Sequence, residues 1–220
     1  MIDLHEAAVE GRLQSTSLRL AERRIAVVGS NGSGKSTLAR LLNGLVEPTS
    51  GRVTVDGLDT RRDGREVRRR VGFVFTDPAA QLVMPTVVED VELSLRKRHR
   101  DKAERHVAAL AVLDRFGLAE LADRSVHALS GGQRQMLAIA TVLATDPQVL
   151  VADEPTTLLD LANTRRVGDV LLGLAQQLVL VTHDLDLAAR CDRALVVHEG
   201  HVTFDGPAAT AVDRYRALVS

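Results

Sequence analysis

The pattern of apolar and polar positions along this chain predicts a mixed α/β fold. Residues 1–28 alternate as strands do, most clearly in the stretch SLRLAERRIAVV at 17–28. A glycine-rich loop follows, and the next segment, 36–45, carries four leucines at helical spacing, the last of which is Leu45. The pattern therefore predicts strands in the first 28 residues and a helix over 36–45.

Further apolar runs predict the rest of a sheet. The segment TSGRVTVDG at 49–57 is typical of a turn followed by a strand, and 71–75 is short and apolar enough to be a buried strand. The runs at 148–153 and 177–182 are continuously apolar, which favours central parallel strands buried on both faces. The segment ALVVHEGHVTF at 194–204 predicts an edge strand or a hairpin.

The middle of the chain, residues 86–144, is predicted to be mainly helical. Thr86 and Glu89 have the spacing of a capping box, which opens a helix. Ser130 is placed to cap another helix. The whole pattern indicates an α/β core that is interrupted by a helical insertion.

Composition sets bounds on what the protein can be. The 220 residues carry a formal net charge of -1, so no global field favours nucleic acid or acidic lipid as a partner. The single cysteine, Cys191, excludes an internal disulfide and is expected to pack as a small apolar residue. No apolar run approaches the ~20 residues of a membrane span, and the acidic N-terminus lacks the order of a signal peptide.

The loop after the apolar strand IAVV at 25–28 carries the first chemical motif. GSNGSGKST matches G-x-x-x-x-G-K-[ST] between a strand and a helix, the context in which this motif binds phosphate. Only three of the 28 basic residues are lysines, and Lys35 is one of them, as suits a compact charge on the β- and γ-phosphates. Ser36 is a candidate Mg²⁺ ligand. The predicted nucleotide-binding residues are Gly29, Ser30, Asn31, Gly32, Ser33, Gly34, Lys35, Ser36 and Thr37.

Two carboxylates end the apolar run at 148–153. Ligands of parallel sheets bind at the carboxyl ends of the strands, where Asp153 and Glu154 stand. Asp153 can hold Mg²⁺ through its water shell, and Glu154 can orient and polarise an attacking water. Together with the phosphate loop upstream, this pair predicts a nucleotide-hydrolysing site that uses ATP and Mg²⁺.

The segment LSGGQRQ at 129–135 is the most specific motif in the chain. Here the sequence resembles the ATP-binding cassette (ABC) ATPases, and the resemblance covers nearly the whole chain. It implies a P-loop NTPase, RecA-like core formed by residues 1–78 and 147–220, with an N-terminal β region. It also implies a helical subdomain at 79–146 that carries the LSGGQ signature.

The same resemblance implies a head-to-tail dimer of cassettes. In that family LSGGQ binds the γ-phosphate held by the other cassette, and a Ser hydroxyl, exposed backbone N–H groups and a helix N-terminus suit that task. His183, at the end of the strand LVLVTH, resembles the switch histidine that contacts the γ-phosphate. The residues expected to contact the opposing nucleotide are Ser130, Gly131, Gly132, Gln133 and, from the loop TTLLD at 156–160, Asp160.

Two positions depart from the family pattern. The family places an aromatic residue near the start of the core to stack on adenine, but residues 1–24 contain no Phe, Tyr or Trp, which leaves Val9 or Arg12 to cover the base. The strand 71–75 leads in the family to a glutamine that reaches the Mg²⁺ and water region, and this chain has Thr76. We expect Thr76 to occupy that sensor position with less reach; the alternative is that it merely caps the turn at 77–78.

The segment DPAAQLVMPTVVEDV at 77–91 narrows the resemblance. It is similar to the ATPases of energy-coupling factor (ECF) importers of vitamins and transition metals, and FTDP at 75–78 is similar to their biotin-type members. The resemblance implies that Val83, Met84 and Pro85 border the groove for a transmembrane coupling protein. Plain internal packing of these residues is the alternative.

The resemblance also implies partners and a place in the cell. The partners are a second copy or a paralogous ATPase, a transmembrane coupling protein and a substrate-binding membrane subunit, with the chain at the cytoplasmic face of the membrane. The basic runs at 61–70 and 96–102 are interpreted as solvated surface, and nucleic acid is not expected as a partner. The alternatives are another ABC importer or exporter, a soluble ABC protein of DNA repair or translation, and a small-metabolite kinase.

Overall fold

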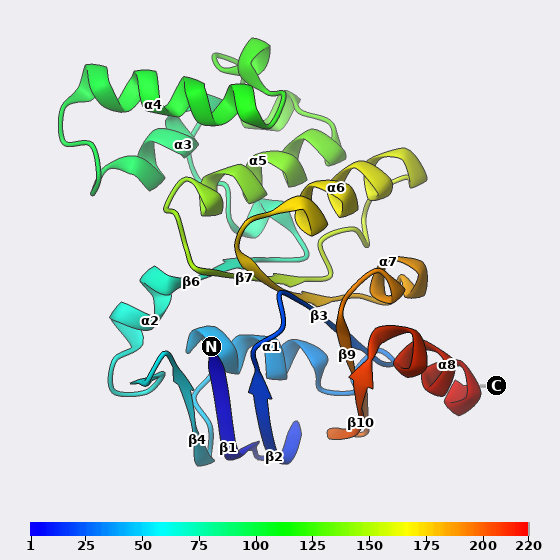
Figure 1. The fold of residues 1–220 in the computed structure, drawn as a ribbon. Coiled ribbons are helices and arrows are strands. Elements are labelled where there is room, and N and C mark those ends of the chain that lie inside the picture. The colour runs from blue at the N-terminus through cyan, green and yellow to red at the C-terminus, as the bar shows by residue number, and fades with distance from the viewer. Residues whose placement is uncertain (220) are drawn as a thin grey trace.

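A six-stranded sheet forms the centre of the protein in the computed structural model, which describes residues 1–219 (Figure 1). The strand order is β10-β9-β3-β8-β7-β6, and all neighbours are parallel except β10, which runs antiparallel to β9. The parallel central strands and the final hairpin predicted from the sequence are confirmed. The bounds are β3 (Arg24–Val28), β6 (Val71–Val74), β7 (Val149–Asp153), β8 (Gln177–Val181), β9 (Arg193–His198) and β10 (His201–Pro207).

A second, antiparallel sheet has the order β2-β1-β4-β5. Its strands are β1 (Ile2–Val9), β2 (Leu13–Leu20), β4 (Ser50–Val55) and β5 (Leu58–Asp59). Helix α1 (Lys35–Asn43) lies between the two sheets (Figure 1), and its apolar face joins their inward side chains in one core cluster. The predicted helix over 36–45 therefore begins one residue late and extends two residues past the observed end: Gly44 ends the helix in the left-handed region, φ 71°, and Leu45 is exposed.

Helices cover the other face of the central sheet. Figure 1 shows α3, α4, α5 and α6 stacked on the side of the sheet opposite α1. The predicted capping box at Thr86 and the predicted cap at Ser130 are confirmed, and Ser130 forms a full capping box with Gln133 at the start of α5. The helices after α1 are α2 (Gly64–Arg70), α3 (Val87–Leu95), α4 (Lys102–Arg115), α5 (Gly131–Leu143), α6 (Leu161–Gly173), α7 (Leu185–Ala189) and α8 (Ala208–Val219).

No helix within residues 1–219 combines the length and the apolar character that crossing a bilayer requires.

Cys191 behaves as the sequence predicts, because it is buried in the core cluster between the central sheet and its covering helices. Burial raises the pKa of its thiol to about 12. We therefore expect native protein at pH 8 to react with iodoacetamide at least about 100-fold more slowly than the guanidinium-unfolded chain, because only the thiolate is nucleophilic. Intact-mass spectrometry over time measures both rates, and equal rates would contradict this placement.

Candidate active site

The candidate site lies at the carboxyl edge of the central sheet. Strand β3 ends before the glycine-rich loop, β6 ends before Thr76, β7 ends at Asp153 and β8 ends before Thr182 and His183. Because these strands are parallel, their carboxyl ends meet at one edge, and residues from four distant segments come together there.

The glycine-rich loop needs glycine at two positions for different reasons. Gly29 lies so close to β9 that a Cβ there would be 2.1 Å from the carbonyl oxygen of Val197. Gly34 has φ 106°, which side chains strain to adopt, and a Cβ there would be 2.7 Å from the carbonyl oxygen of Arg12. The loop is thus held between the strand β9 and the β1–β2 turn, with its backbone free to face the cavity.

Lys35 is poised at the start of α1. Its side chain is only 4% exposed, and its Nζ donates to the carbonyl oxygens of Gly29 and Ser30, both at 2.9 Å. Nζ also lies 3.6 Å from Oε1 of Glu154. The two hydrogen bonds of the ammonium go to neutral carbonyl oxygens, and a phosphate would replace these with stronger, charged acceptors.

Asp153 is buried next to the helix that carries the phosphate loop. Ser36 donates from Oγ to Oδ1 of Asp153 at 2.8 Å, and Nη2 of Arg40 lies 3.8 Å from Oδ2. Burial raises the pKa of the Asp153 carboxyl, and the Ser36 hydrogen bond and the Arg40 charge oppose that shift. Sequence reasoning missed Arg40, although its place four residues after Ser36 puts it on the same helix face.

Glu154 is held in an uncommon backbone conformation. Its φ is 51°, in the left-handed region, and its N–H donates to the carbonyl oxygen of Val181 on β8 at 2.9 Å. Besides Lys35, its carboxylate accepts from Thr157 Oγ1 at 3.1 Å and lies 3.8 Å from Nδ1 of His183. The two residues predicted to be catalytic, Glu154 and His183, are therefore neighbours.

Thr76 has a definite partner that the sequence did not indicate. Its Oγ1 donates to the backbone carbonyl oxygen of Asp153 at 2.8 Å. The turn that follows is capped by Asp77, whose Oδ1 accepts from Ala79 N at 2.9 Å, so the alternative that Thr76 caps this turn is wrong. Because the hydroxyl proton is used in the bond to Asp153, only the oxygen lone pairs of Thr76 remain for a water or a metal.

A cavity of about 540 Å³ is lined by the phosphate loop, Thr76 and Glu154, but not by Asp153 or His183. Val9 does not reach it, because this side chain is buried among the core residues of the first sheet, so the hypothesis that Val9 covers a base is wrong. The β1–β2 turn contributes in its place. The lining residues are Gly11, Arg12, Asn31, Gly32, Ser33, Gly34, Lys35, Ser36, Thr37, Thr76 and Glu154.

The signature segment lies outside this cavity. Oγ of Ser130 accepts from the N–H of Gln133 at 3.3 Å, and Oε1 of Gln133 accepts from the N–H of Ser130 at 2.9 Å. This reciprocal pair fixes the start of α5 and leaves the Ser130 hydroxyl proton available for another acceptor. None of the residues 130–133 lines the cavity of the same chain.

The start of α5 packs closely on the start of α6. Asp160 caps α6 by accepting from the N–H of Asn163 at 2.8 Å and from its Nδ2 at 2.9 Å. That bond orients Asn163 toward Gly132, where an added Cβ would be 2.2 Å from Asn163 Oδ1. Gly132 is therefore required by contact with Asn163 as well as by any role in binding.

The donor set suits a small, hard cation. Within residues 1–219 no three His, Cys, Asp or Glu side chains gather as a metal cluster. The Ser36 hydroxyl and the Asp153 carboxylate are oxygen donors of the type Mg²⁺ prefers, and Mg²⁺ takes most of its other ligands from phosphates and water. The residues present therefore fit Mg²⁺ bound together with a nucleotide.

A glycine-rich loop at a helix N-terminus, a buried lysine, a serine–aspartate pair and a following glutamate define the class of P-loop nucleotide hydrolases. The comparisons are more specific. The family model described as ABC transporter matches residues 13–157, and the chain belongs to that family. It is an ATPase of that family.

Several relatives cover almost the whole chain. The chain is 46% identical over 208 residues to the biotin transport ATP-binding protein BioM of Rhizobium etli, covering 94% of this chain and 92% of that protein. It is 41% identical to the energy-coupling factor transporter ATP-binding protein EcfA1 of Halalkalibacterium halodurans, over 84% and 68% of the two chains.

Two solved structures share the fold. CbiO1 of Clostridium perfringens, described as part of the ABC transporter complex cbiONQ, has a TM-score of 0.86 and 29% identity, with 99% of this chain and 92% of that one covered. The cassette MJ0796, solved as a dimer in a post-hydrolysis state bound to ADP and Pi, has a TM-score of 0.82 and 31% identity, with 94% and 99% covered.

Asp153→Asn tests the cost of the buried carboxylate. Burial raises the pKa of Asp153 in the folded protein above its unfolded value of 3.8. The parent therefore loses stability as pH rises from 3.8 through the folded-state pKa, and the amide variant, which does not titrate, keeps its stability there. We expect the nucleotide-free variant to be the more stable protein at pH 7 and to lose that advantage at pH 4, as measured by urea unfolding. Asp123→Asn, at an exposed position, is the control; a variant less stable than the parent at pH 7 would contradict the inference.

Thr76→Val removes the hydroxyl with little change of shape. We expect it to lower the free energy of unfolding by about 1 kcal/mol, the usual value of one hydrogen bond. We also expect ATP hydrolysis to fall by about tenfold, because the carbonyl of Asp153 loses its anchor beside the reacting groups. Thr76→Ser keeps the hydroxyl and should retain both. Parent values of stability and turnover for Thr76→Val would show that this bond has no role.

Proposed function

We propose that the protein is the ATPase subunit that powers import of a vitamin or a transition-metal ion through a separate transmembrane protein, and that it works as a pair of cassettes. One observation carries the proposal: the cavity is lined by the phosphate loop, by Ser36, which donates to Asp153, and by Glu154, whereas the signature segment lies outside it on an exposed helix start. A cavity that lacks its signature needs a second chain to supply one.

In this proposal each predicted residue has a task that its contacts support. Lys35 moves from its carbonyl acceptors to the β- and γ-phosphates, and the N–H groups of the loop and of α1 bind the phosphate oxygens. Glu154, directed by its left-handed backbone, orients the attacking water, and His183 beside it contacts the γ-phosphate. Ser36 and Asp153 hold Mg²⁺, which supplies charge stabilisation to the phosphates when bound.

The second cassette would contribute the start of α5. The hydroxyl of Ser130 and the N–H groups of Gly131 and Gly132 present donors and a positive helix end to an anion. The loop before α6 would meet the partner as well, since Leu158 and Leu161 are 67% and 66% exposed and Asp160 is fixed between them. Exposed leucines on both sides of a fixed carboxylate suit a surface that becomes buried in a dimer.

A membrane partner would dock on the loop that leads into the start of α3. Val83 is 68% exposed in this loop, which is fixed because the buried Asp90 accepts from the N–H groups of Val83 and Met84 at 3.1 and 3.2 Å. Val83, Met84 and Pro85 do not line the cavity of about 730 Å³ that lies between α2 and the end of α3. That cavity is lined by Arg68, Arg69, Leu93, Ser94, Arg96, Lys97, Arg98 and Thr145.

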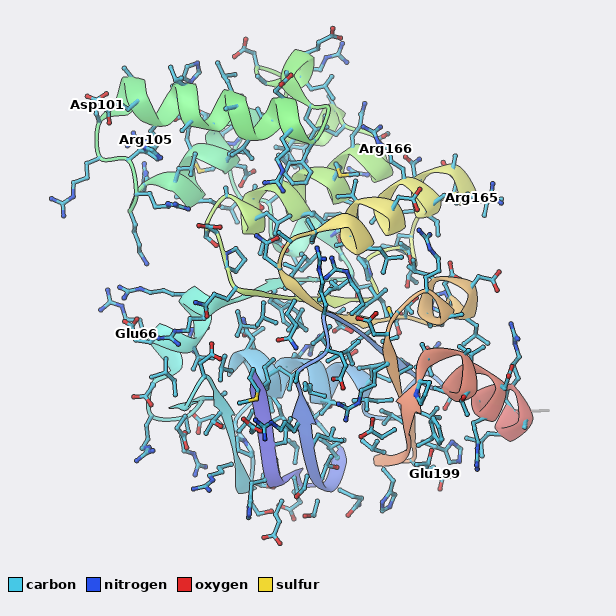
Figure 2. All side chains as sticks on the ribbon, in the orientation of Figure 1. Glu66, Asp101, Arg105, Arg165, Arg166 and Glu199 are labelled. Atoms are coloured by element: carbon cyan, nitrogen blue, oxygen red, sulfur yellow. The ribbon has the colours of Figure 1, made fainter. Side chains whose placement is uncertain are left out.

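The α3–α4 loop that forms part of this cavity is held from the start of α4. Figure 2 shows Asp101 and Arg105 at that end of the helix. Asp101 caps α4 by accepting from the N–H of Glu104 at 2.9 Å, and Nη1 of Arg105 donates to the carbonyl oxygens of His99 and Arg100 at 3.0 and 3.2 Å. The loop next to the basic residues of this cavity is therefore held in place. This supports a role for these residues in docking, in contrast to the interpretation of the basic runs as solvated surface.

The relatives guide the choice of substrate. Two of the relatives compared are named for biotin transport, and both match nearly the full chain. We therefore test biotin first and a transition-metal ion second. In a strain that lacks the gene, uptake of tritiated biotin and of radioactive cobalt is measured with the parent chain or with Lys35→Ala restored. Restoration of either uptake by the parent alone supports import; restoration of neither overturns this function while leaving the ATPase class intact.

Glu154→Gln is expected to bind ATP and hydrolyse it at least about 100-fold more slowly, because the amide cannot accept a proton from water. ATP would then remain between two chains. Light scattering in saturating Mg-ATP should report a dimer for the variant and a monomer after ATP is exchanged for ADP. A protein that stays monomeric under both conditions would contradict self-pairing, and mixing it with the paralogous ATPase distinguishes a mixed pair.

Val83→Asp is expected to lower recovery of the membrane subunit at least about tenfold, because a charge cannot enter an apolar docking contact without a partner. The chain is purified from detergent-solubilised membranes, and bound integral membrane proteins are quantified by mass spectrometry. Val107→Asp is the matched control, because Val107 is 67% exposed on the far helix α4. Equal recovery with both variants would exclude the surface around Val83 as the docking site.

A further inference from the structure

The β1–β2 turn forms a part of the nucleotide cavity that has no role in phosphate or metal chemistry. Gly11 and Arg12, which belong to this turn, line the cavity together with the phosphate loop. The residues at the hydrolytic side of the cavity, Thr76, Ser36 and Glu154, are joined to one another through Asp153, Lys35 and β8. Within residues 1–219 the Arg12 side chain makes no hydrogen bond or ion pair with any of them, so the turn forms a separate wall of the cavity.

This wall is fixed against the phosphate loop. The carbonyl oxygen of Arg12 is 2.7 Å from the ideal Cβ position of Gly34. The β9–β10 turn, where Figure 2 labels Glu199, holds the two segments together. In that turn Gly200 N donates to Ser33 O at 2.9 Å, and Gly200 O accepts from Gln14 N at 2.8 Å.

The Arg12 guanidinium is a cation without a partner. Within residues 1–219 it makes no ion pair and no side-chain hydrogen bond, and the residue is exposed. The other cation lining the cavity, Lys35, is buried and held by two carbonyl oxygens. An unpaired arginine beside a ligand cavity is available to the ligand.

No aromatic side chain of the chain can cover a base in this cavity. The protein has four Phe, one Tyr and no Trp, and none of the five lines the cavity. All of them pack elsewhere: Phe73 and Phe75 stack at 4.8 Å between ring centroids, Phe204 lies under Arg214, and Phe116 and Tyr215 belong to the helical side of the core. A purine in this cavity must therefore be covered by a side chain that is not aromatic.

We propose that Arg12 covers the purine base of the bound nucleotide by stacking its planar guanidinium on the ring. This rests on the binding of phosphates by the glycine-rich loop and adds the residue that selects a nucleotide over a bare phosphate chain. A guanidinium stacks on aromatic faces and is weakly hydrated, so the contact loses little solvation. Stacking reads the face of a ring and not its edge, so ATP and GTP should bind with similar affinities.

The experiment compares ATP with inorganic tripolyphosphate, which has the same phosphates and no base, by calorimetric titration of the whole chain. Arg12→Ala should weaken ATP binding about tenfold, in the range of a desolvated cation–π contact, and leave tripolyphosphate binding within about twofold. Arg12→Tyr keeps a stacking surface without the charge and should restore ATP binding to within about threefold of the parent. Arg65→Ala removes an exposed arginine of α2 and is the control for net charge.

Two results would overturn the proposal. An equal loss of ATP and tripolyphosphate affinity in Arg12→Ala would place Arg12 on the phosphates, and unchanged ATP affinity would remove it from the site. Loss of the fold is excluded if Arg12→Ala still binds tripolyphosphate. A parent chain that binds neither ATP nor tripolyphosphate would mean instead that the phosphate loop itself was assigned wrongly, which is a different failure.

Discussion

The buried carboxylate of Asp153 is the constraint on which the site depends. A charge at the end of a central strand is costly in the absence of compensation, and a hydroxyl, a distant guanidinium and the charge of Lys35 compensate that of Asp153 in part. The neighbouring Lys35 is almost as deeply buried and is held by neutral carbonyl oxygens. Two incompletely satisfied charges at one sheet edge form a site whose electrostatics improve when phosphate and a cation enter together.

The fold around this edge holds those charges in place rather than neutralising them. Thr76 anchors the carbonyl of Asp153, and the N–H of Glu154 is bound to β8, so the backbone between the two carboxylates is fixed from both neighbouring strands. Glu154 accepts a left-handed conformation that costs of order 1 kcal/mol or more. This conformation sets the direction of the side chain. The backbone hydrogen bonds on either side hold the Glu154 carboxylate toward the cavity.

Much of this arrangement was predictable from the sequence because it depends on local pattern. The strand, loop and helix around Lys35, the capping box at Thr86, the cap at Ser130 and the parallel core strands follow from periodicity and short motifs. The partner of Thr76 was not predictable, because Asp153 is 77 residues away and no pattern indicates a bond to its backbone. The prediction that Val9 covers the base was wrong for a similar reason. Strand alternation shows that one face of β1 is buried, but not which residues near its end reach the cavity.

The close contact of Gly132 with Asn163 links the starts of α5 and α6. Asn163 is hydrogen-bonded to Asp160 at the start of α6 and packs directly on Gly132 at the start of α5, so the two helix starts are in tight contact. In a pair of chains, the segment that receives the other chain's nucleotide and the loop that touches the other chain's surface would then move as one rigid piece. Nucleotide binding at one of the two shared sites would then displace the starts of α5 and α6 together. That displacement would reach the other site through the contact of Gly132 with Asn163, without a change in the central sheet.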